Sequence, residues 1–89
     1  MPHPRFSGEE IERRGQELYE QSLRARVEPG NEGKIIVIDI ETGDYEIDDT
    51  MLAASRRALA KHPEAALWAL RIGHDAVYSF GPDLESAKP

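Results

Sequence analysis

The side chains of this chain best suited to chemistry are five carboxylates that recur at nearly every second position. They are Asp39, Glu41, Asp44, Glu46 and Asp48. Calcium and magnesium ions bind several carboxylate oxygens at once, and alternate residues of a hairpin strand lie on one face. The Asp-x-Asp-x-Asp-Gly spacing of an EF-hand loop is absent, however. We therefore expect a hydrated acidic surface that binds cations weakly, and no dedicated metal site.

Asp39 and Glu41, with Thr42 and Gly43 behind them, end an apolar run. This pattern resembles the first motif of the DEDD exonucleases, in which two carboxylates hold two magnesium ions for phosphodiester hydrolysis. The resemblance implies a metal-dependent phosphodiesterase that uses Asp39 and Glu41. The later aspartates of that family have no counterpart, because His74-Asp75 are adjacent instead of spaced along a helix. A nuclease is therefore the alternative function.

Other catalytic and cofactor-binding patterns are missing from the sequence. There is no cysteine, which excludes disulfides, thiolate zinc sites and cysteine nucleophiles. The histidines His3, His62 and His74 follow no zinc spacing. No serine lies in a Gly-x-Ser-x-Gly turn, and no glycine-rich loop leads through a lysine into a helix. We expect a protein that is not an enzyme and binds no cofactor.

Length and charge narrow the class of protein further. The 89 residues allow a single domain, 1–89, with residues 1–6 and 82–89 as flexible tails that each carry two prolines. Seventeen acidic and eleven basic residues give a net charge of -6, which disfavours a nucleic-acid partner. No apolar run approaches the length of a membrane span, and no signal peptide is visible. Together with the absence of cysteine, this favours the cytoplasm.

The long N-terminal element is predicted to be a helix over Gly8 to Val27. Ser7 and Glu10 have the spacing of a capping box at its start. The apolar stripe of the helix consists of Ile11, Gly15, Leu18, Ser22 and Ala25, flanked by Tyr19 and Leu23. Because Gly15 and Ser22 are small, they permit a close approach by whatever packs on the stripe.

Two strands of a hairpin are predicted to follow. Lys34 to Ile40 is apolar on both faces, which is typical of a central strand. Thr42-Gly43 predicts a tight turn. Tyr45 and Ile47 then alternate with acids, so the second strand has one hydrated face and suits an edge.

A second helix and two more strands complete the pattern. The helix is predicted over Thr50 to Lys61, with Asp48 or Asp49 as its cap. Its apolar face consists of Leu52, Ser55, Leu59 and His62, with Met51, Ala54 and Ala58 beside it. The last two strands are predicted over Ala66 to Ile72 and Ala76 to Phe80.

The fold class that these elements indicate is α+β, in the order α-β-β-α-β-β. A right-handed crossover through the second helix leaves strand one between strands two and three. We therefore expect a four-stranded, mainly antiparallel sheet of order 2-1-3-4 with one packed helix. The long N-terminal helix could share that helix's side, cover the other face, or pack on another chain.

Large apolar side chains are the candidates for a partner surface. They are Ile11, Leu18, Tyr19, Trp68 and Tyr78. Aromatic residues at the centre of a patch often dominate binding energy, although the same residues also suit a core. At ~1.5 Å per residue the first helix reaches about 30 Å, which favours a homodimer through this helix.

A family resemblance covers most of the chain. The features are Gly33-Lys34 before a strand, the hairpin from Asp39 to Tyr45, a helix to His62 followed by Pro63, and Leu70-Arg71-Ile72-Gly73. They resemble a family of small bacterial proteins without an assigned function, frequent in cyanobacteria. The resemblance implies the same compact core and brings no catalytic residue. Such short acidic proteins also resemble the antitoxin or accessory half of two-gene modules.

The function that we expect from the sequence is a non-enzymatic protein–protein interaction module, antitoxin-like or accessory to a neighbouring gene product. Its partner is another protein or a second copy of itself, and neither nucleic acid nor a membrane. The alternatives are the phosphodiesterase centred on Asp39 and Glu41, and a simple structural homodimer.

Overall fold

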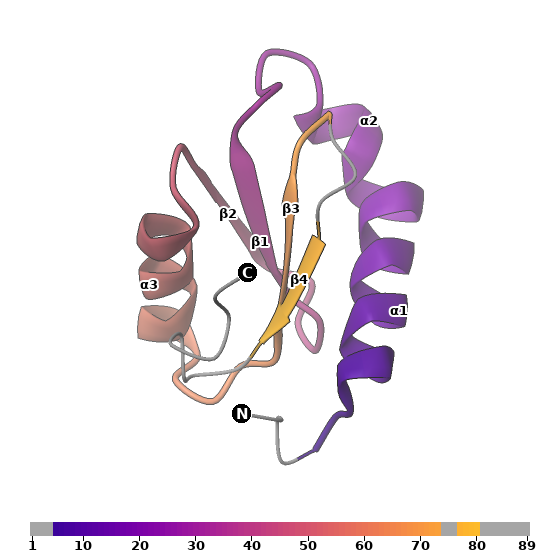
Figure 1. Cartoon of the computed structure of the whole chain (residues 1–89), viewed down its shortest axis with the longest axis vertical. Coiled ribbons are helices and arrows are strands. Elements are labelled where there is room, and N and C mark those ends of the chain that lie inside the picture. Colours follow the sequence, from indigo (N-terminus) through magenta and orange to yellow (C-terminus); the bar gives the residue numbers. More distant parts are fainter. Residues whose placement is uncertain (1–4, 74–76, 81–89) are drawn as a thin grey trace.

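The computed structural model describes residues 5–73 and 77–80, the last four without their side chains. The sheet forms a middle layer, and helices lie on both sides of it (Figure 1). The elements are α1 (Gly8–Leu18), η1 (Tyr19–Leu23), α2 (Arg24–Val27), β1 (Ile35–Asp39), β2 (Tyr45–Asp48), α3 (Met51–Lys61), β3 (Leu67–Arg71) and β4 (Val77–Phe80).

The sheet is antiparallel, and β1 pairs with β2 on one side and β3 on the other. This confirms an α+β fold with a long N-terminal helix, a second helix and an antiparallel sheet. The segment β4 runs antiparallel to β3. The four-stranded order 2-1-3-4 stays a prediction, because the residues on either side of β4, 74–76 and 81–89, lie outside the described residues. The flexible tails predicted over 1–6 and 82–89 also stay a prediction, and residues 1–4 and 82–89 lie outside the described residues.

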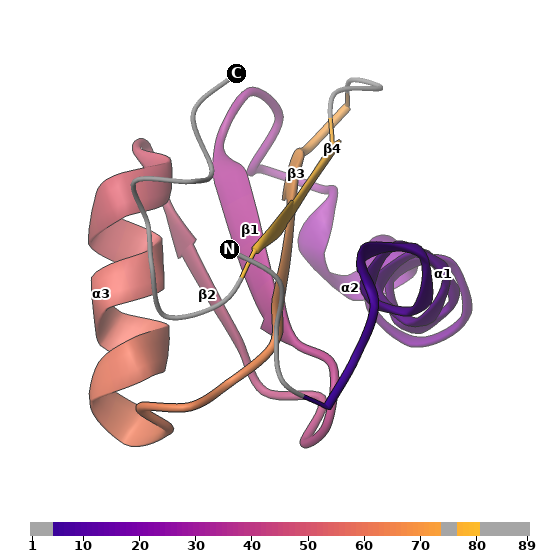
Figure 2. The same cartoon turned by 60° about the horizontal axis from the view of Figure 1, so that its bottom comes forward.

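The two helical layers cover opposite faces of the sheet (Figure 2). The α3 helix packs over β1 and β2, whereas α1 packs over β3 and β4. Of the three positions open to the N-terminal helix, the structure therefore has the face opposite α3. The helices are offset diagonally, so β2 lies at the side of the sheet away from α1.

The N-terminal helix contains one wide turn, and this turn changes which residues face the sheet. The predicted stripe is wrong in its second half, because Ser22 and Ala25 are exposed. The buried residues are instead spaced by four: Ile11, Gly15, Tyr19, Leu23 and Val27. An α-helix advances by about 100° per residue, so a repeat of four drifts by about 40° each time. The π-helical turn η1 holds more residues per turn and offsets this drift.

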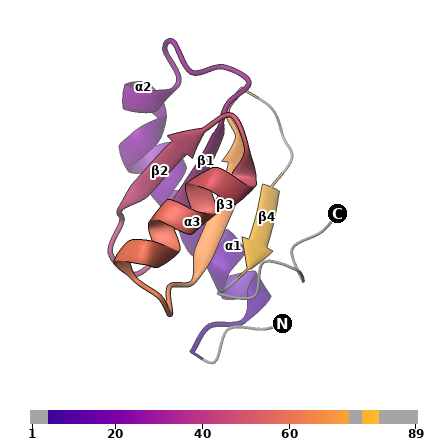
Figure 3. The same cartoon turned by 90° about the vertical axis from the view of Figure 1, so that its left-hand side faces the viewer.

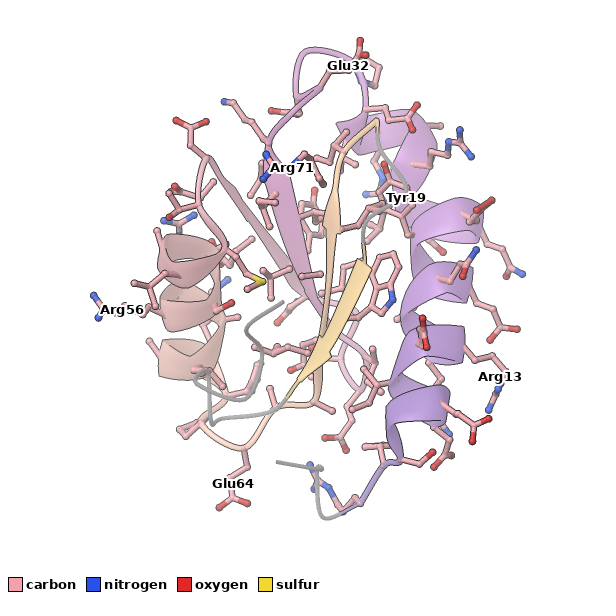
Figure 4. The ribbon with its side chains drawn as sticks, in the orientation of Figure 1. Arg13, Tyr19, Glu32, Arg56, Glu64 and Arg71 are labelled. Carbon is pink, nitrogen blue, oxygen red and sulfur yellow. The ribbon has the colours of Figure 1, made fainter. Side chains whose placement is uncertain are left out.

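The helix approaches the sheet closely at Gly15. A Cβ atom built there would lie 2.1 Å from Cγ of Trp68, so only glycine fits beside the indole ring. Tyr19 lies next to the same ring, with 6.0 Å between ring centroids, and points toward the sheet (Figure 4). The expectation that a small residue at Gly15 permits close packing is confirmed.

The α3 helix begins one residue later than predicted and has a different cap. Thr50, not Asp48 or Asp49, accepts the N–H of Ala53 at its side chain, at 3.2 Å. Its buried face is centred on Ala54, Ser55 and Ala58. Leu52 was predicted to lie on this face, but it is 50% exposed because it falls on the flank of the helix.

Replacing Gly15 by alanine should lower the free energy of unfolding by about 1–3 kcal/mol. Elsewhere in a helix the same change is favourable by up to about 1 kcal/mol, so the clash with Trp68 reverses the usual sign. Chemical denaturation of both proteins would measure the difference.

The matched control for this prediction is Gly8→Ala. Gly8 also lies in α1, but a Cβ there would meet no atom within 4 Å. We expect no loss of stability in this control. Equal stability of Gly15→Ala and the wild type would contradict the close packing of α1 on Trp68.

Candidate functional site

The Asp-x-Glu motif lies in the loop that joins β1 to β2. Asp39 is only 3% exposed, and its Oδ1 accepts the N–H groups of Glu41 at 2.9 Å and Thr42 at 3.4 Å. The carbonyl oxygen of Asp39 accepts the N–H of Gly43 at 2.8 Å. Gly43 has a φ of 81°, which an L side chain rarely adopts. Because Asp39 pairs with Asp44, the loop between them is longer than the predicted two-residue turn. The side chain of Asp39 stabilises the loop through its hydrogen bonds to Glu41 and Thr42.

The second carboxylate of the motif has a different partner. Glu41 forms an ion pair with Arg5, a residue that the sequence placed in the loose N-terminal end. Glu64 joins both carboxylates in lining a shallow hollow of about 310 Å³ beside the loop. Among residues 5–73 and 77–80, no three histidine, cysteine, aspartate or glutamate side chains could together hold a metal ion. The contacts of Asp39 lie within the turn, and the contact of Glu41 is its ion pair with Arg5.

The acids of β2 bind α3 to the sheet. Glu46 is 16% exposed and accepts from Arg57 Nε at 2.9 Å and from Lys61 Nζ at 2.5 Å. Asp48 accepts from Arg57 Nη1 at 3.0 Å. The expectation of a hydrated acidic strand face is therefore wrong at these two positions. We call Glu46, Asp48, Arg57 and Lys61 the charge clamp.

Protonation states follow from the contacts of the charge clamp. The hydrogen bond from Lys61, and then that from Arg57, lowers the pKa of Glu46 below its ordinary value of 4.5. Arg57 likewise lowers the pKa of Asp48. The pKa of Lys61 is raised, chiefly by its hydrogen bond to Glu46. All four groups thus carry their charges near neutral pH, and the clamp has no net charge.

The outer side of β2 is the sheet edge of interest within the described residues. Asp39 N–H donates to Asp44 O at 2.9 Å, and bonded positions alternate in an antiparallel pair. Glu46 and Asp48 therefore turn their backbone groups toward β1, whereas Tyr45 and Ile47 turn theirs outward. In the part of the chain that the structure describes, no strand pairs with this edge. Figure 3 shows β2 at one side of the sheet, with α3 lying in front of the strands.

Two features of the chain border this edge. Arg57 Nη2 donates to the outward carbonyl oxygen of Ile47 at 2.9 Å, which occupies one of its two lone pairs. On the face opposite α3, Tyr45 and Ile47 are partly buried and pack against the larger core cluster. We call these two side chains the apolar ledge. It extends the core to the edge of the sheet.

The residues predicted to bind a partner do not form one exposed patch. Ile11, Tyr19 and Trp68 are 2%, 4% and 1% exposed, so they belong to the core between helix and sheet. Leu18 is partly exposed and lines a shallow hollow with Ile40. The Tyr78 side chain lies outside the described residues. The outer face of the helix is charged instead, and Arg13 points away from the sheet (Figure 4).

Sequence reasoning missed the edge of β2 as a candidate site. Its signal was present in the alternation of Tyr45 and Ile47 with acids, which correctly predicted an edge strand. The missing information was which backbone groups turn outward, and this depends on the hydrogen-bond register with β1. No pattern in the sequence indicated that Arg57 forms ion pairs with the acids of β2.

Comparisons with protein-family models, curated proteins and solved structures found no match to this chain. The resemblances to a small bacterial family and to the first DEDD motif therefore stay predictions. Within the described ranges, no helix combines the length and apolar character needed to cross a membrane.

A pair of substitutions at Asp39 tests its role in the loop. Asparagine keeps an oxygen that can accept both N–H groups, so Asp39→Asn should keep most of the wild-type stability. Asp39→Ala should lose about 1–2 kcal/mol, because the partly buried hydrogen bonds from the N–H groups of Glu41 and Thr42 lose their acceptor. Thermal unfolding with and without magnesium would measure both. Magnesium stabilisation of the wild type that vanishes in Asp39→Asn would instead indicate a metal site.

Acid should weaken the charge clamp. Because the pKa of Glu46 is lowered in the folded state, its stabilising contribution is fully present above 4.5 and is lost as the pH falls below that value. Glu46→Gln should therefore show a shallower decrease of Tm between pH 6 and 3 than the wild type.

The control for the acid prediction is Glu12→Gln, which removes an exposed acid on the outer face of α1. This variant should follow the wild-type curve. If Glu46→Gln also follows it, Glu46 contributes no pH-dependent stability and the clamp does not hold α3.

Proposed function

We propose that this protein is a non-enzymatic protein-interaction module that binds an extended polypeptide segment along β2. The observation that carries the proposal is the outward direction of the backbone groups of Tyr45 and Ile47. An edge strand with such groups is a template for an added strand, which recurs in peptide recognition. Main-chain hydrogen bonds would supply affinity, and the side chains beside the edge would supply specificity.

The apolar ledge favours this edge as a binding element. A strand added beside β2 would place its alternate side chains next to Tyr45 and Ile47, on the face that α1 leaves uncovered. Cross-strand apolar pairs of this kind contribute about 0.2–1 kcal/mol each. On the other face, the added strand would meet the charge clamp, whose charges already balance.

The rest of the described surface supports no stronger candidate. Leu52 is the exposed large hydrophobic residue among the described side chains, and a single one is ordinary on a protein surface. The carboxylates of the nuclease-like motif are engaged in shaping and pairing the loop. A phosphodiesterase thus gains no observation in its favour.

The finer features of the proposal follow from the sequence. We infer a four-stranded sheet of order 2-1-3-4, in which β4 closes the side opposite β2 and leaves β2 as the binding edge. A cytoplasmic location is inferred because the chain has no cysteine. The antitoxin-like or accessory role, with a partner encoded by a neighbouring gene, remains the biological setting that we propose.

A charged residue on the ledge should abolish partner binding. Ile47→Lys places an ammonium group on the face opposite α3, where the side chains of an added strand would remove it from water. Natural edge strands prevent pairing with charged side chains of this kind. We expect co-purification with the product of the neighbouring gene to fall by at least about tenfold, a change of about 1.4 kcal/mol.

Leu52→Lys is the matched control, since it also replaces an aliphatic residue by lysine. Leu52 lies five residues before Arg57, about 140° away around the α3 axis, so it does not face the β2 edge. This variant should bind like the wild type. Equal binding by Ile47→Lys would exclude β2 as the binding element.

A further inference from the structure

We propose that the segment bound along β2 is the β2 strand of a second copy, paired antiparallel about a two-fold axis at Glu46. This inference rests on the proposed function and names its partner. Closed two-fold dimers use the same surface on both copies, so the surface must be complementary to itself. The β2 edge meets this requirement in its hydrogen bonds, its apolar side chains and its charges.

The hydrogen-bonding pattern is self-complementary. Tyr45 and Ile47 turn their backbone groups outward, and they lie symmetrically on either side of Glu46. With the axis at Glu46, Tyr45 of one copy pairs with Ile47 of the second, and each pair exchanges two main-chain bonds. The Ile47 carbonyl can accept the new N–H beside Arg57, since it has two lone pairs.

The apolar ledge is also complementary to itself. In this register, Tyr45 of each copy lies directly opposite Ile47 of the other, on the face away from α3. Both side chains are partly buried in the single chain. Pairing an aromatic with a β-branched side chain is favourable across strands, and it would join the two cores into one continuous apolar layer.

The balanced charges of the clamp reduce the electrostatic repulsion that would oppose self-association. The chain carries a net charge of -6, and Glu46 would face Glu46 of the second copy. Each Glu46, however, is bound by Arg57 and Lys61 of its own chain. Asp48 supplies the second negative charge, so the net charge of the clamp is zero in each copy. In the dimer, the clamp of one copy would lie beside the identical clamp of the other.

The position of α3 leaves room for the second copy. It packs over both β1 and β2, and neighbouring strands lie about 4.8 Å apart. In the paired sheet, the two α3 helices would therefore lie about 10 Å apart, which is close to the spacing of packed helices. A helix centred farther out, over the edge itself, would have blocked the pairing.

Sedimentation velocity on the purified chain, over a range of concentrations, tests for the dimer. The expected result is a species of twice the 10.0 kDa chain mass. Ile47→Lys should weaken self-association by at least about tenfold, whereas Leu52→Lys should leave it unchanged. A wild type that stays monomeric at all concentrations overturns the proposal.

Amide hydrogen exchange measured by NMR on the wild type tests the register without any substitution. The Tyr45 and Ile47 amides should slow as concentration rises, because pairing protects them. The Glu46 and Asp48 amides should be protected at every concentration, since they pair with β1. A dimer in which the Tyr45 and Ile47 amides stay fast uses another surface and also overturns the proposal.

The two proposals can fail separately. A monomeric wild type whose binding to the neighbouring gene product still depends on Ile47 overturns the self-pairing and keeps the strand-addition function. A monomer whose binding does not depend on Ile47 overturns both.

Discussion

The structure depends on one constraint: two neighbouring strands, β1 and β3, are apolar on both faces. Their side chains from Ile35 to Ile38 and from Leu67 to Leu70 are buried on both sides of the sheet. Such a sheet is stable only if both faces are covered. In a short chain this requires one helix on each side, and the polypeptide supplies α3 for one face and the N-terminal helix for the other.

Covering the second face determines the form of the long helix. The helix must approach Trp68 closely, and Gly15 allows this because it has no Cβ. It must also keep side chains spaced by four in contact with the sheet over its whole length, and the π-helical turn at Tyr19–Leu23 corrects the drift. Such π-helical turns often occur at functional sites. In this protein, the packing of the helix on the sheet explains the turn.

The face of the sheet under α3 is covered with the help of Glu46 and Asp48, which the sequence predicted to be hydrated. The α3 helix packs with small residues such as Ala54 and Ala58, so its apolar contact area is limited. Arg57 and Lys61 add ion pairs to the partly buried Glu46 and to Asp48. The same pairs neutralise the α3 side of the β2 edge, which links the stability of this layer to the surface that we propose for binding.

The sequence by itself determined the two helical segments, the first three strands, and the apolar character of both faces of β1. These properties are local, because strand side chains alternate with a period of two and caps act over three residues. Only the tertiary structure decided which face the long helix covers, the phase of its stripe, and the partners of Asp39, Glu41 and Glu46. These depend on distances between segments far apart in the chain, such as Arg57 to Glu46 and Gly15 to Trp68, and no local period encodes them.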